Sequence, residues 1–305
     1  MILHFNSDLP HLIKRPQHVI ANYGGALLSP CNESTDSVVW LGFHRHWISF
    51  GIPLRFCAMS DTKVALVTGA GRGIGRDIAQ ALAKDGYACG LIARTKSQLD
   101  ETAELIRKAG GKAVVTPTDV SNRAAVLSAV ETIERELGPI SVLINNAGAY
   151  LKKKFTEIAE DEFDFQFKVN CYGPFFCSQA VVAKMAERRD GTIIFVLGSE
   201  TRGGPAQYSA YTGSKLAQRA IAESLAYEFG HLGVHTAALD VDGAVDSARV
   251  RESMPEVDPS WFVSPKRICE EILHLIHQPK DSWTFQVDLR SYSQWRPRVA
   301  PKKKP

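Results

Sequence analysis

The amino-acid sequence predicts an α/β protein with a doubly wound parallel sheet of about seven strands and helices on both faces. The first observation is that short, apolar, β-branched runs alternate with amphipathic segments from Lys63 onward. The second is that these runs are apolar almost throughout, which is typical of parallel strands buried on both sides. The third is a glycine cluster directly after the first strand, where a doubly wound sheet holds its ligand.

The first strand is expected at residues 63–68, KVALVT, immediately before the glycine cluster. Ile74, Ile78 and Leu82 then recur every four residues, which predicts an amphipathic helix. The later strand segments repeat the apolar, β-branched composition of the first. They are expected at residues 88–93, 113–118, 140–145, 193–198, 238–241 and 284–289.

The helices between these strands carry their own start and stop signals. The second helix should end at Gly110 and Gly111, because glycine favours the conformation that terminates a helix. Ser121 is expected to cap the third helix, which should run as far as Gly138. Each helix would connect one parallel strand to the next.

The first 58 residues do not share this pattern. They are rich in proline and histidine and show no sustained helical or strand period, whereas Met59 leads almost directly into the first strand. We expect a poorly ordered, dispensable extension or an artefact of gene prediction. The alternatives are a targeting peptide and a flap formed by Trp40, Phe43 and Trp47. The expected parts are therefore an extension at 1–58, a catalytic domain at 59–290 and a basic tail at 291–305.

The composition is that of an ordinary globular protein, with 45% hydrophobic and 23% charged residues. A net charge of +3 gives no reason to expect nucleic acid or an anionic membrane surface as a partner. Residues 38–56 are apolar, but His44, Arg45 and His46 lie at their centre, which argues against a membrane span. The six cysteines lack metal-ligand spacing, so we expect no metal site and a reducing, cytoplasmic location.

The stretch YSAYTGSK places Tyr211 and Lys215 one helical turn apart on the same face. A lysine ammonium beside a phenol favours the phenolate and lowers the pKa of the phenol, so such a pair suits proton transfer. A second pair with the same spacing, Tyr150 and Lys154, lies in YLKKK. The spacing alone does not choose between them, and either pair could be two polar residues on a solvated helix.

The glycine cluster TGAGRGIG has the spacing TG-x3-G-x-G, with glycines at Gly69, Gly73 and Gly75. Glycine lets the backbone turn tightly and approach a pyrophosphate, whose charge the N-terminus of the following helix stabilises. A glycine-rich turn without a ligand is the alternative. The position between a strand and a helix favours nucleotide binding.

This loop and five further motifs resemble, in order and approximate spacing, the single-domain branch of the short-chain dehydrogenase/reductase family over residues 62–290. The resemblance implies a Rossmann-type fold and makes Tyr211 the catalytic tyrosine. It places Tyr150 in a loop on the substrate side and leaves Lys154 as a surface lysine. The other motifs are TDV with Asp119, NNAG from Asn145, VNCYG with Asn170, LGSE with Ser199, and YTGSK with Tyr211 and Lys215.

The resemblance implies a catalytic tetrad of Asn170, Ser199, Tyr211 and Lys215. Tyr211 would be the general acid and base, and Lys215 would favour its phenolate and bind the nicotinamide ribose. Ser199 would hold the substrate oxygen, and Asn170 would position a water in the proton relay. A serine after Gly198 could instead only cap a helix, and Asn170 could only satisfy a helix backbone.

The expected cofactor is NADP(H) rather than NAD(H). The second strand ends at Arg94 and Thr95 without the carboxylate that would accept hydrogen bonds from an unphosphorylated ribose. Arg72 and Arg94 suit a 2′-phosphate, although both could be surface arginines. The expected cofactor-binding residues are Gly69, Arg72, Gly73, Ile74, Gly75, Arg94, Thr95, Asp119, Val120, Asn145, Asn146, Ala147, Gly148, Tyr211, Lys215, Gly243, Val245 and Ser247.

The sequence departs from the family pattern after the sixth strand. Asp242 and Gly243 replace the usual Pro-Gly pair, and Ser247 stands where threonine is commoner, which puts the rigidity of this loop in doubt. Residues 248–263 would form a substrate lid, and their apolar character indicates a hydrophobic or aromatic carbonyl. The lid would be lined by Met254, Trp261 and Phe262.

The sequence therefore predicts an NADP(H)-dependent oxidoreductase that interconverts a small, hydrophobic ketone or aldehyde with its alcohol. The resemblance further implies a homodimer or homotetramer that pairs through long helices near 157–186 and 209–231. A 3-oxoacyl-carrier-protein-type reductase is the alternative within the family. It ranks second because the last strand is not followed here by the two glycines usual in those relatives. A non-catalytic NADP(H)-binding sensor or scaffold is the competing class, and it would not need a complete tetrad.

Overall fold

The computed structural model describes residues 62–198 and 203–294, together with four short strands nearer the N-terminus. The chain divides into two compact units, Met1–Met59 and Ser60–Pro305, and each is described by itself. Ser199, one of the expected tetrad residues, lies outside the described residues.

The larger unit is built on a seven-stranded sheet with the order β11-β10-β9-β8-β5-β6-β7, and every pair of neighbouring strands is parallel. The predicted doubly wound parallel sheet is confirmed, and a strand lies at each of the seven expected places. The strands are β5 (Val64–Thr68), β6 (Ala88–Ala93), β7 (Ala113–Pro117), β8 (Ile140–Asn145), β9 (Gly191–Gly198), β10 (Val234–Asp242) and β11 (Gln286–Arg290).

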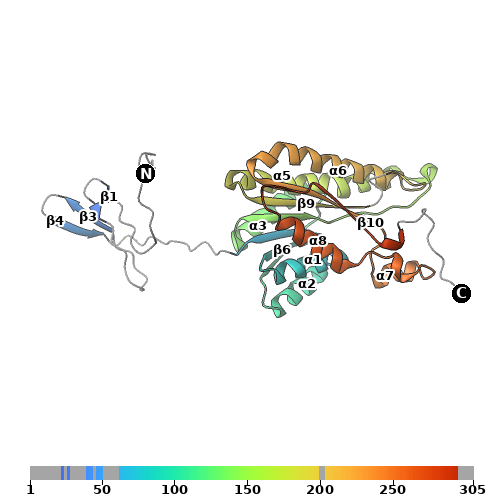
Figure 1. The fold of residues 1–305 in the computed structure, drawn as a ribbon, viewed down its shortest axis with the longest axis horizontal. Coiled ribbons are helices and arrows are strands. Elements are labelled where there is room, and N and C mark those ends of the chain that lie inside the picture. The colour runs from blue at the N-terminus through green and yellow to red at the C-terminus, as the bar shows by residue number, and fades with distance from the viewer. Residues whose placement is uncertain are drawn as a thin grey trace. The chain divides into compact units, whose positions relative to one another are not determined.

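Helices cover both faces of this sheet. Figure 1 shows α5 and α6 on one side and α1, α2 and α8 on the other. The long helices are α1 (Gly73–Lys84), α2 (Lys96–Lys108), α3 (Arg123–Leu137), α4 (Glu160–Phe167), α5 (Gly173–Arg188), α6 (Ser209–Phe229) and α8 (Pro265–Ile276). The short elements are η1 (Phe155–Glu157), η4 (Gly230–Leu232), α7 (Ala248–Ser253), η5 (Pro259–Trp261) and η6 (Tyr292–Gln294).

The strands are apolar on both sides because successive side chains point to opposite faces and each face has its own core. In β5, Ala65 and Val67 join the core that includes α1, α2 and α8. Val64 and Leu66, in the same strand, join the core that includes α3, α5 and part of α6. A single polar substitution in this strand would therefore disturb one of two separate cores.

The third helix begins differently from its prediction. The sequence predicts Ser121 as its cap, but the capping side chain is Asn122, which accepts a hydrogen bond from the backbone N–H of Ala125 at 3.1 Å. The Ser121 hydroxyl instead donates to Asp119 at 2.7 Å. Because the Ser121 hydroxyl is bonded to Asp119, the cap falls to Asn122, and the prediction of Ser121 as the cap is wrong.

A π-helical turn, η2 (Lys168–Tyr172), joins α4 to α5. Asn170 lies inside this turn and is completely buried. The three segments together correspond to the long helix expected near 157–186. Single π-turns inside α-helices commonly occur at functional sites.

The N-terminal unit has an antiparallel sheet of β1 (Asn22–Tyr23), β2 (Ala26–Leu27), β3 (Val39–Phe43) and β4 (His46–Phe50). The sequence predicts no strand here, whereas the structure pairs β3 with β4 along their whole length. The aromatic and β-branched residues of VWLGF and HWISF favour a strand even without a clear alternation. Among the helices that the structure describes, none is long and apolar enough to cross a membrane.

Candidate active site

The candidate site lies at the point in the sheet where the strand order reverses. β5 pairs with β6 on one side and with β8 on the other, so the chain winds outward both ways from β5. In such sheets ligands bind in the crevice beyond the carboxyl ends of the strands at this switch point. The glycine loop follows β5, and the NNAG segment follows β8.

The glycine loop has a backbone that requires glycine at its key positions. Gly69 and Gly73 have φ angles of +68° and +53°, a region that side chains with a Cβ rarely adopt. A Cβ on Gly75 would lie 2.2 Å from the carbonyl oxygen of Gly69 and 2.6 Å from Nδ2 of Asn146. The loop therefore packs directly on the NNAG segment.

The N-terminus of α1 suits an anionic ligand. Its N-cap residue, Arg72, makes no side-chain capping hydrogen bond, and the first turn contains no acidic residue. The orphan N–H groups of this turn and the positive end of the helix dipole are left for a ligand. Together with the glycine backbone, this arrangement fits the pyrophosphate of a dinucleotide.

Two residues that the sequence did not indicate hold the glycine loop from behind. The guanidinium of Arg76 donates to the carbonyl oxygen of Gly71 at 2.7 Å and to Glu101 at 2.7 Å. The buried hydroxyl of Thr102 donates to the carbonyl oxygen of Ala70 at 3.0 Å. The loop is therefore fixed to α2. The sequence does not indicate these contacts, because they depend on the packing of α1 against α2.

A third such residue, Thr68, connects the two loops of the switch point. Its hydroxyl oxygen accepts hydrogen bonds from the backbone N–H groups of Asn146 and Ala147, each at 2.9 Å, and donates to the carbonyl oxygen of Ile144 at 3.2 Å. Asn146 returns a bond from its amide to the carbonyl oxygen of Thr68 at 2.9 Å. These bonds join the NNAG segment to the end of the central strand β5.

The end of β6 carries the residues expected to choose between cofactors. Arg94, Thr95 and Arg72 are all exposed. The guanidinium of Arg94 lies 5.8 Å from the ring centre of Phe165 on α4, at cation–π distance. Phe165 is a further residue beside this part of the site that the sequence did not indicate.

Asp119 follows β7 with its carboxylate already engaged. The Oδ1 atom accepts from the backbone N–H of Ser121 at 2.9 Å and from its hydroxyl at 2.7 Å. The next residue, Val120, is buried against Gly173, where an added Cβ would lie 2.7 Å from Cγ2 of Val120. Residues 119–120 are therefore held firmly between β7 and the start of α5.

Tyr211 and Lys215 lie on the same face of α6, as the spacing predicts. The side chain of Lys215 is only 4% exposed, and its Nζ donates to the carbonyl oxygen of Val196 and to Oε1 of Gln218, each at 3.0 Å. A Cβ on Gly148 would lie 3.7 Å from this Nζ. The helix, β9 and the NNAG segment thus converge on one buried ammonium.

Asn170 ties the π-turn to the segment after NNAG. Its Oδ1 accepts from the backbone N–H of Ala149 at 2.8 Å, and its Nδ2 donates to the carbonyl oxygen of Ala149 at 2.9 Å. The same Nδ2 donates to the hydroxyl of Ser214 at 2.9 Å, and that hydroxyl donates to the carbonyl oxygen of Tyr211 at 2.8 Å. The side chain therefore links NNAG to the helix that carries Tyr211.

Aromatic side chains surround Tyr211. The rings of Tyr150 and Tyr211 meet edge to face, with centroids 5.2 Å apart. The hydroxyl groups of Tyr150 and Tyr208 lie 2.9 Å apart in a hydrogen bond, although 62% of Tyr150 is exposed. The structure thus brings Tyr150 next to Tyr211, whereas Lys154 is paired with Glu157 at the surface.

The loop after β10 makes contacts that could hold it in place without the usual proline. Asp242 forms an ion pair with Arg290 at the end of β11. Gly243 has a φ angle of +147°, and Val245 forms a bridge with Val263. Ser247 caps the short helix α7 through Val250. The ion pair and the bridge hold the base of the expected lid, and Phe262 is buried within it.

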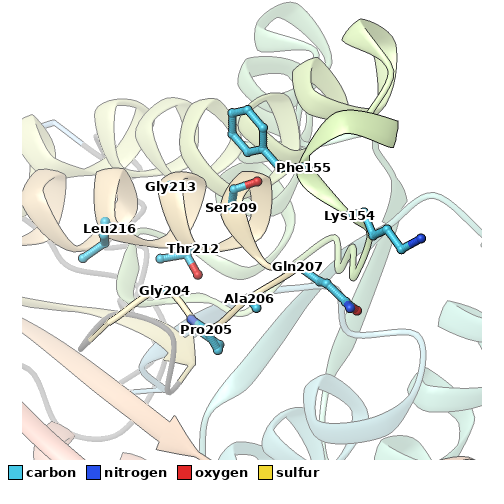
Figure 2. A pocket seen from close by; sticks show the side chains of 10 residues that line it. All are labelled: Lys154, Phe155, Gly204, Pro205, Ala206, Gln207, Ser209, Thr212, Gly213 and Leu216. Atoms are coloured by element: carbon cyan, nitrogen blue, oxygen red, sulfur yellow. The ribbon is translucent and has the colours of Figure 1, made fainter.

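A cavity of about 600 Å³ lies beside α6, on the side of the helix that faces away from Tyr211 and Lys215. Figure 2 shows this cavity. Ser209, Thr212, Gly213 and Leu216 form one stripe along the helix, whereas Tyr211, Ser214, Lys215 and Gln218 form another. None of the expected site residues lines this cavity. Figure 2 shows its remaining lining of Lys154, Phe155, Gly204, Pro205, Ala206 and Gln207.

Two of the described cysteines, Cys89 and Cys177, are buried in the cores on the two faces of the sheet. Burial raises the pKa of the thiols of Cys89 and Cys177 to about 12, so neither is a reactive thiolate. Within residues 62–198 and 203–294, no group of three or more histidine, cysteine, aspartate or glutamate side chains could hold a metal ion.

The fold and the loop geometry define a class of protein. A model of the short chain dehydrogenase family matches residues 63–256, and the chain belongs to this family. It is an oxidoreductase with a Rossmann-type sheet. The catalytic residues and the cofactor contacts remain predictions.

Particular relatives can be compared with the chain. An uncharacterized oxidoreductase of Staphylococcus aureus (strain USA300) is 31% identical over 228 residues, which cover 75% of this chain and 96% of the relative. An alcohol dehydrogenase of the archaeon Thermococcus sibiricus, solved with 5-hydroxy-NADP, is 30% identical with a TM-score of 0.70, covering 78% of this chain and 100% of that one. A variant of the actinorhodin polyketide ketoreductase with NADPH is 26% identical with a TM-score of 0.70, covering 76% and 97%.

Proposed function

We propose that the protein is an NADP(H)-dependent oxidoreductase that interconverts a hydrophobic ketone or aldehyde and its alcohol, with Tyr211 as general acid and base. The observation that carries this proposal is the buried ammonium of Lys215, one helical turn from Tyr211 and next to Gly148. A buried charge beside a phenol at the ligand crevice of a doubly wound sheet suits proton transfer.

The residues of the chain would act on the proton and on the positions of the reactants. When bound, the nicotinamide cofactor would exchange a hydride with the carbonyl carbon. The phenol of Tyr211 would give its proton to the carbonyl oxygen, and the phenolate would take a proton back from solvent. The ammonium of Lys215 stabilises that phenolate. Ser199 would hold the substrate oxygen, and Asn170 would position the relay water through its backbone, because its side chain is engaged elsewhere.

The residues at the end of β6 support NADP(H) over NAD(H). Arg94 and Arg72 are exposed and offer guanidinium groups near the adenosine end of the crevice, where no carboxylate ends the strand. The alcohol dehydrogenase and the polyketide ketoreductase described above are bound to NADP-type cofactors. A xylitol dehydrogenase of similar fold binds NAD⁺, but at 22% identity it indicates the fold alone.

A second candidate is the reduction of a keto group on an acyl chain held by a carrier protein. The likeness to the polyketide ketoreductase favours it, whereas the C-terminus after β11 differs from that of carrier-linked reductases. The two candidates share their chemistry and differ only in how the substrate is delivered.

A homodimer through α5 and α6 completes the proposal. These helices enclose a groove of about 490 Å³ that is lined by apolar side chains such as Phe175, Val182 and Ile221. Phe163 of α4, Tyr172 of η2 and Tyr227 of α6 are also exposed. Exposed apolar surface of this kind is typical of an interface between subunits.

The test is turnover by the purified protein with NADPH or NADH and a panel of aliphatic, aromatic and carrier-bound carbonyl compounds. Reduction of free hydrophobic ketones or aldehydes with NADPH would support the first candidate, and activity restricted to carrier-bound substrates would support the second. Tight NADPH binding without turnover of any carbonyl would favour the sensor or scaffold class instead.

A further inference from the structure

Lys215 has a partner on its own helix that no part of the sequence pattern indicates. Gln218 lies three residues further along α6 and is completely buried. Its Oε1 accepts a hydrogen bond from Nζ of Lys215 at 3.0 Å, and the carbonyl oxygen of Val196 accepts a second at 3.0 Å. Both of these acceptors are neutral oxygens.

This arrangement is costly for Gln218 itself. Its amide nitrogen, Nε2, is buried and has no hydrogen-bond partner among the residues that the structure describes. An unpaired buried N–H group destabilises the folded state. A leucine would fill a similar volume without that cost, so packing alone does not account for glutamine here.

The carbonyl oxygen of the amide gives a reason for glutamine at position 218. Burial disfavours a charged ammonium, and nearby oxygen atoms that accept its hydrogen bonds favour the charged form. A carboxylate at this position would also accept the bond, but its negative charge would cancel that of the lysine. A neutral amide stabilises the ammonium and leaves its charge to act on Tyr211.

Other charged groups face the same region from neighbouring elements. Asp240 and Asp242 lie on the face of β10 that packs against α6, and both are buried. Arg290 on β11 pairs with Asp242. Arg219, on α6 itself, is directed to Glu223 and to Gln286 of β11. These groups are constant between the variants compared below.

We infer that Gln218 is a positioning residue, which holds the ammonium of Lys215 charged and in place beside Tyr211 and Gly148. The inference rests on the proposed roles of Tyr211 and Lys215. It assigns Gln218 no contact with substrate or cofactor.

The first test is the pH profile of alcohol oxidation with NADP⁺, which needs the phenolate of Tyr211. In Gln218→Leu the ammonium loses the acceptor that Gln218 provides, while the bond to Val196 remains, so the acid limb of kcat/KM should move up by about one pH unit. Oxidation at pH 7 should fall about tenfold and recover near pH 9. Gln218→Glu should move the limb at least as far. Gln80→Leu, which removes a glutamine of α1 remote from Lys215, should leave the limb in place.

The second test does not depend on activity. Thermal unfolding is measured for wild type, Gln218→Leu, Lys215→Met and the double variant. With Lys215 present, Gln218→Leu should lower the unfolding midpoint by at least about 2 °C. In the Lys215→Met background the same substitution should raise the midpoint, because it then removes only an amide that has lost its lysine partner.

The outcomes separate this inference from the proposed function. An unchanged acid limb, or the same sign of the Gln218→Leu effect in both backgrounds, would overturn the inference. A protein that turns over no carbonyl compound but shows the sign reversal would retain the Gln218–Lys215 link and refute the proposed function.

Discussion

The ring of Tyr150 packs edge to face against the ring of Tyr211, with an interplanar angle of 67° and centroids 5.2 Å apart. The two tyrosines that the x3-lysine spacing cannot distinguish in sequence are therefore neighbours in space. They differ in their lysines: Lys215 is buried, whereas Lys154 is exposed and pairs with Glu157. A charge acts more strongly in a buried, low-dielectric place, which favours Tyr211 as the proton donor.

Tyr211→Phe should abolish turnover and leave NADPH binding within a few-fold, because the change removes the phenolic proton and little packing. Steady-state kinetics and a fluorescence titration with NADPH measure the two effects separately. Tyr150→Phe is the matched variant and should keep most of the activity, since it removes a hydroxyl that bonds to Tyr208 and leaves the ring in place. Similar kinetics for the two variants would show that the choice of tyrosine is wrong.

Arg94→Asp should reverse the cofactor preference from NADPH to NADH. The carboxylate would repel the 2′-phosphate and accept hydrogen bonds from the unphosphorylated ribose. The measurement is the ratio of kcat/KM for the two cofactors. Arg135→Asp, at an exposed position on α3, should leave the ratio unchanged. Equal efficiency of the parent protein with both cofactors would contradict the assignment of Arg94.

Thr68→Val should lower the free energy of unfolding by about 1–3 kcal/mol, because it leaves the N–H groups of Asn146 and Ala147 without their acceptor. Cofactor affinity should fall as well, since these bonds fix the two loops of the crevice. Denaturant unfolding and an NADPH titration measure both. Thr68→Ser keeps the hydroxyl and should behave nearly as wild type; a serine variant as damaged as the valine variant would assign the effect to the lost methyl group.

The regular elements follow from local sequence. The apolar runs and the spacing of Ile78 and Leu82 predict strands and helices because both faces of the sheet need a core. β10 begins before its predicted position, since polar His235 and Thr236 interrupt the apolar run yet are buried by partners distant in sequence. A periodic pattern does not contain that information.

The supports of the site follow from tertiary contacts and could not be read from sequence. The π-turn at Asn170 depends on bonds to Ala149 and Ser214, which lie 21 and 44 residues away. Arg76 reaches the glycine loop only because α1 lies beside α2. Motifs therefore predict which residues are brought together, while the residues that hold them in place emerge only from the packed fold.

Folding stability should decrease as the pH falls below about 6.5, in part through His235. Burial lowers the pKa of its imidazole below the usual 6.5. Hydrogen bonds to the backbone of Thr284 and Leu275 raise this pKa, but the effect of burial is larger. The unfolded chain therefore binds a proton that the folded chain does not, and stability is lost as the pH drops from the unfolded pKa towards the folded one.

His235→Gln should flatten this dependence below pH 6.5, measured as the unfolding midpoint against pH. The variant also loses the ring stacked on Trp283, with centroids 5.0 Å apart, so its stability at neutral pH should be lower. His231→Gln, at an exposed position, should keep the wild-type slope. An unchanged slope in His235→Gln would assign the acid sensitivity to other groups.

A chain that starts at Met59 should fold, bind NADPH and match the specific activity of the full chain within about two-fold. The division into units at Met59 supports this expectation, as does the S. aureus relative, 96% of which is matched by only 75% of this chain. The strands β3 and β4 pair with each other, which is consistent with a segment that needs no strand of the larger sheet.

The competing possibility is a flap in which Trp40, Phe43 and Trp47 act on the substrate. Truncation would then raise KM for hydrophobic carbonyl compounds while leaving NADPH affinity and the unfolding midpoint unchanged. Replacing the three aromatic residues by serine in the full chain is the matched control, because it should reproduce that rise in KM only if the side chains touch the substrate. If truncation instead caused loss of solubility or of most activity, residues 1–58 would be part of the working protein, and the expectation that they are dispensable would be wrong.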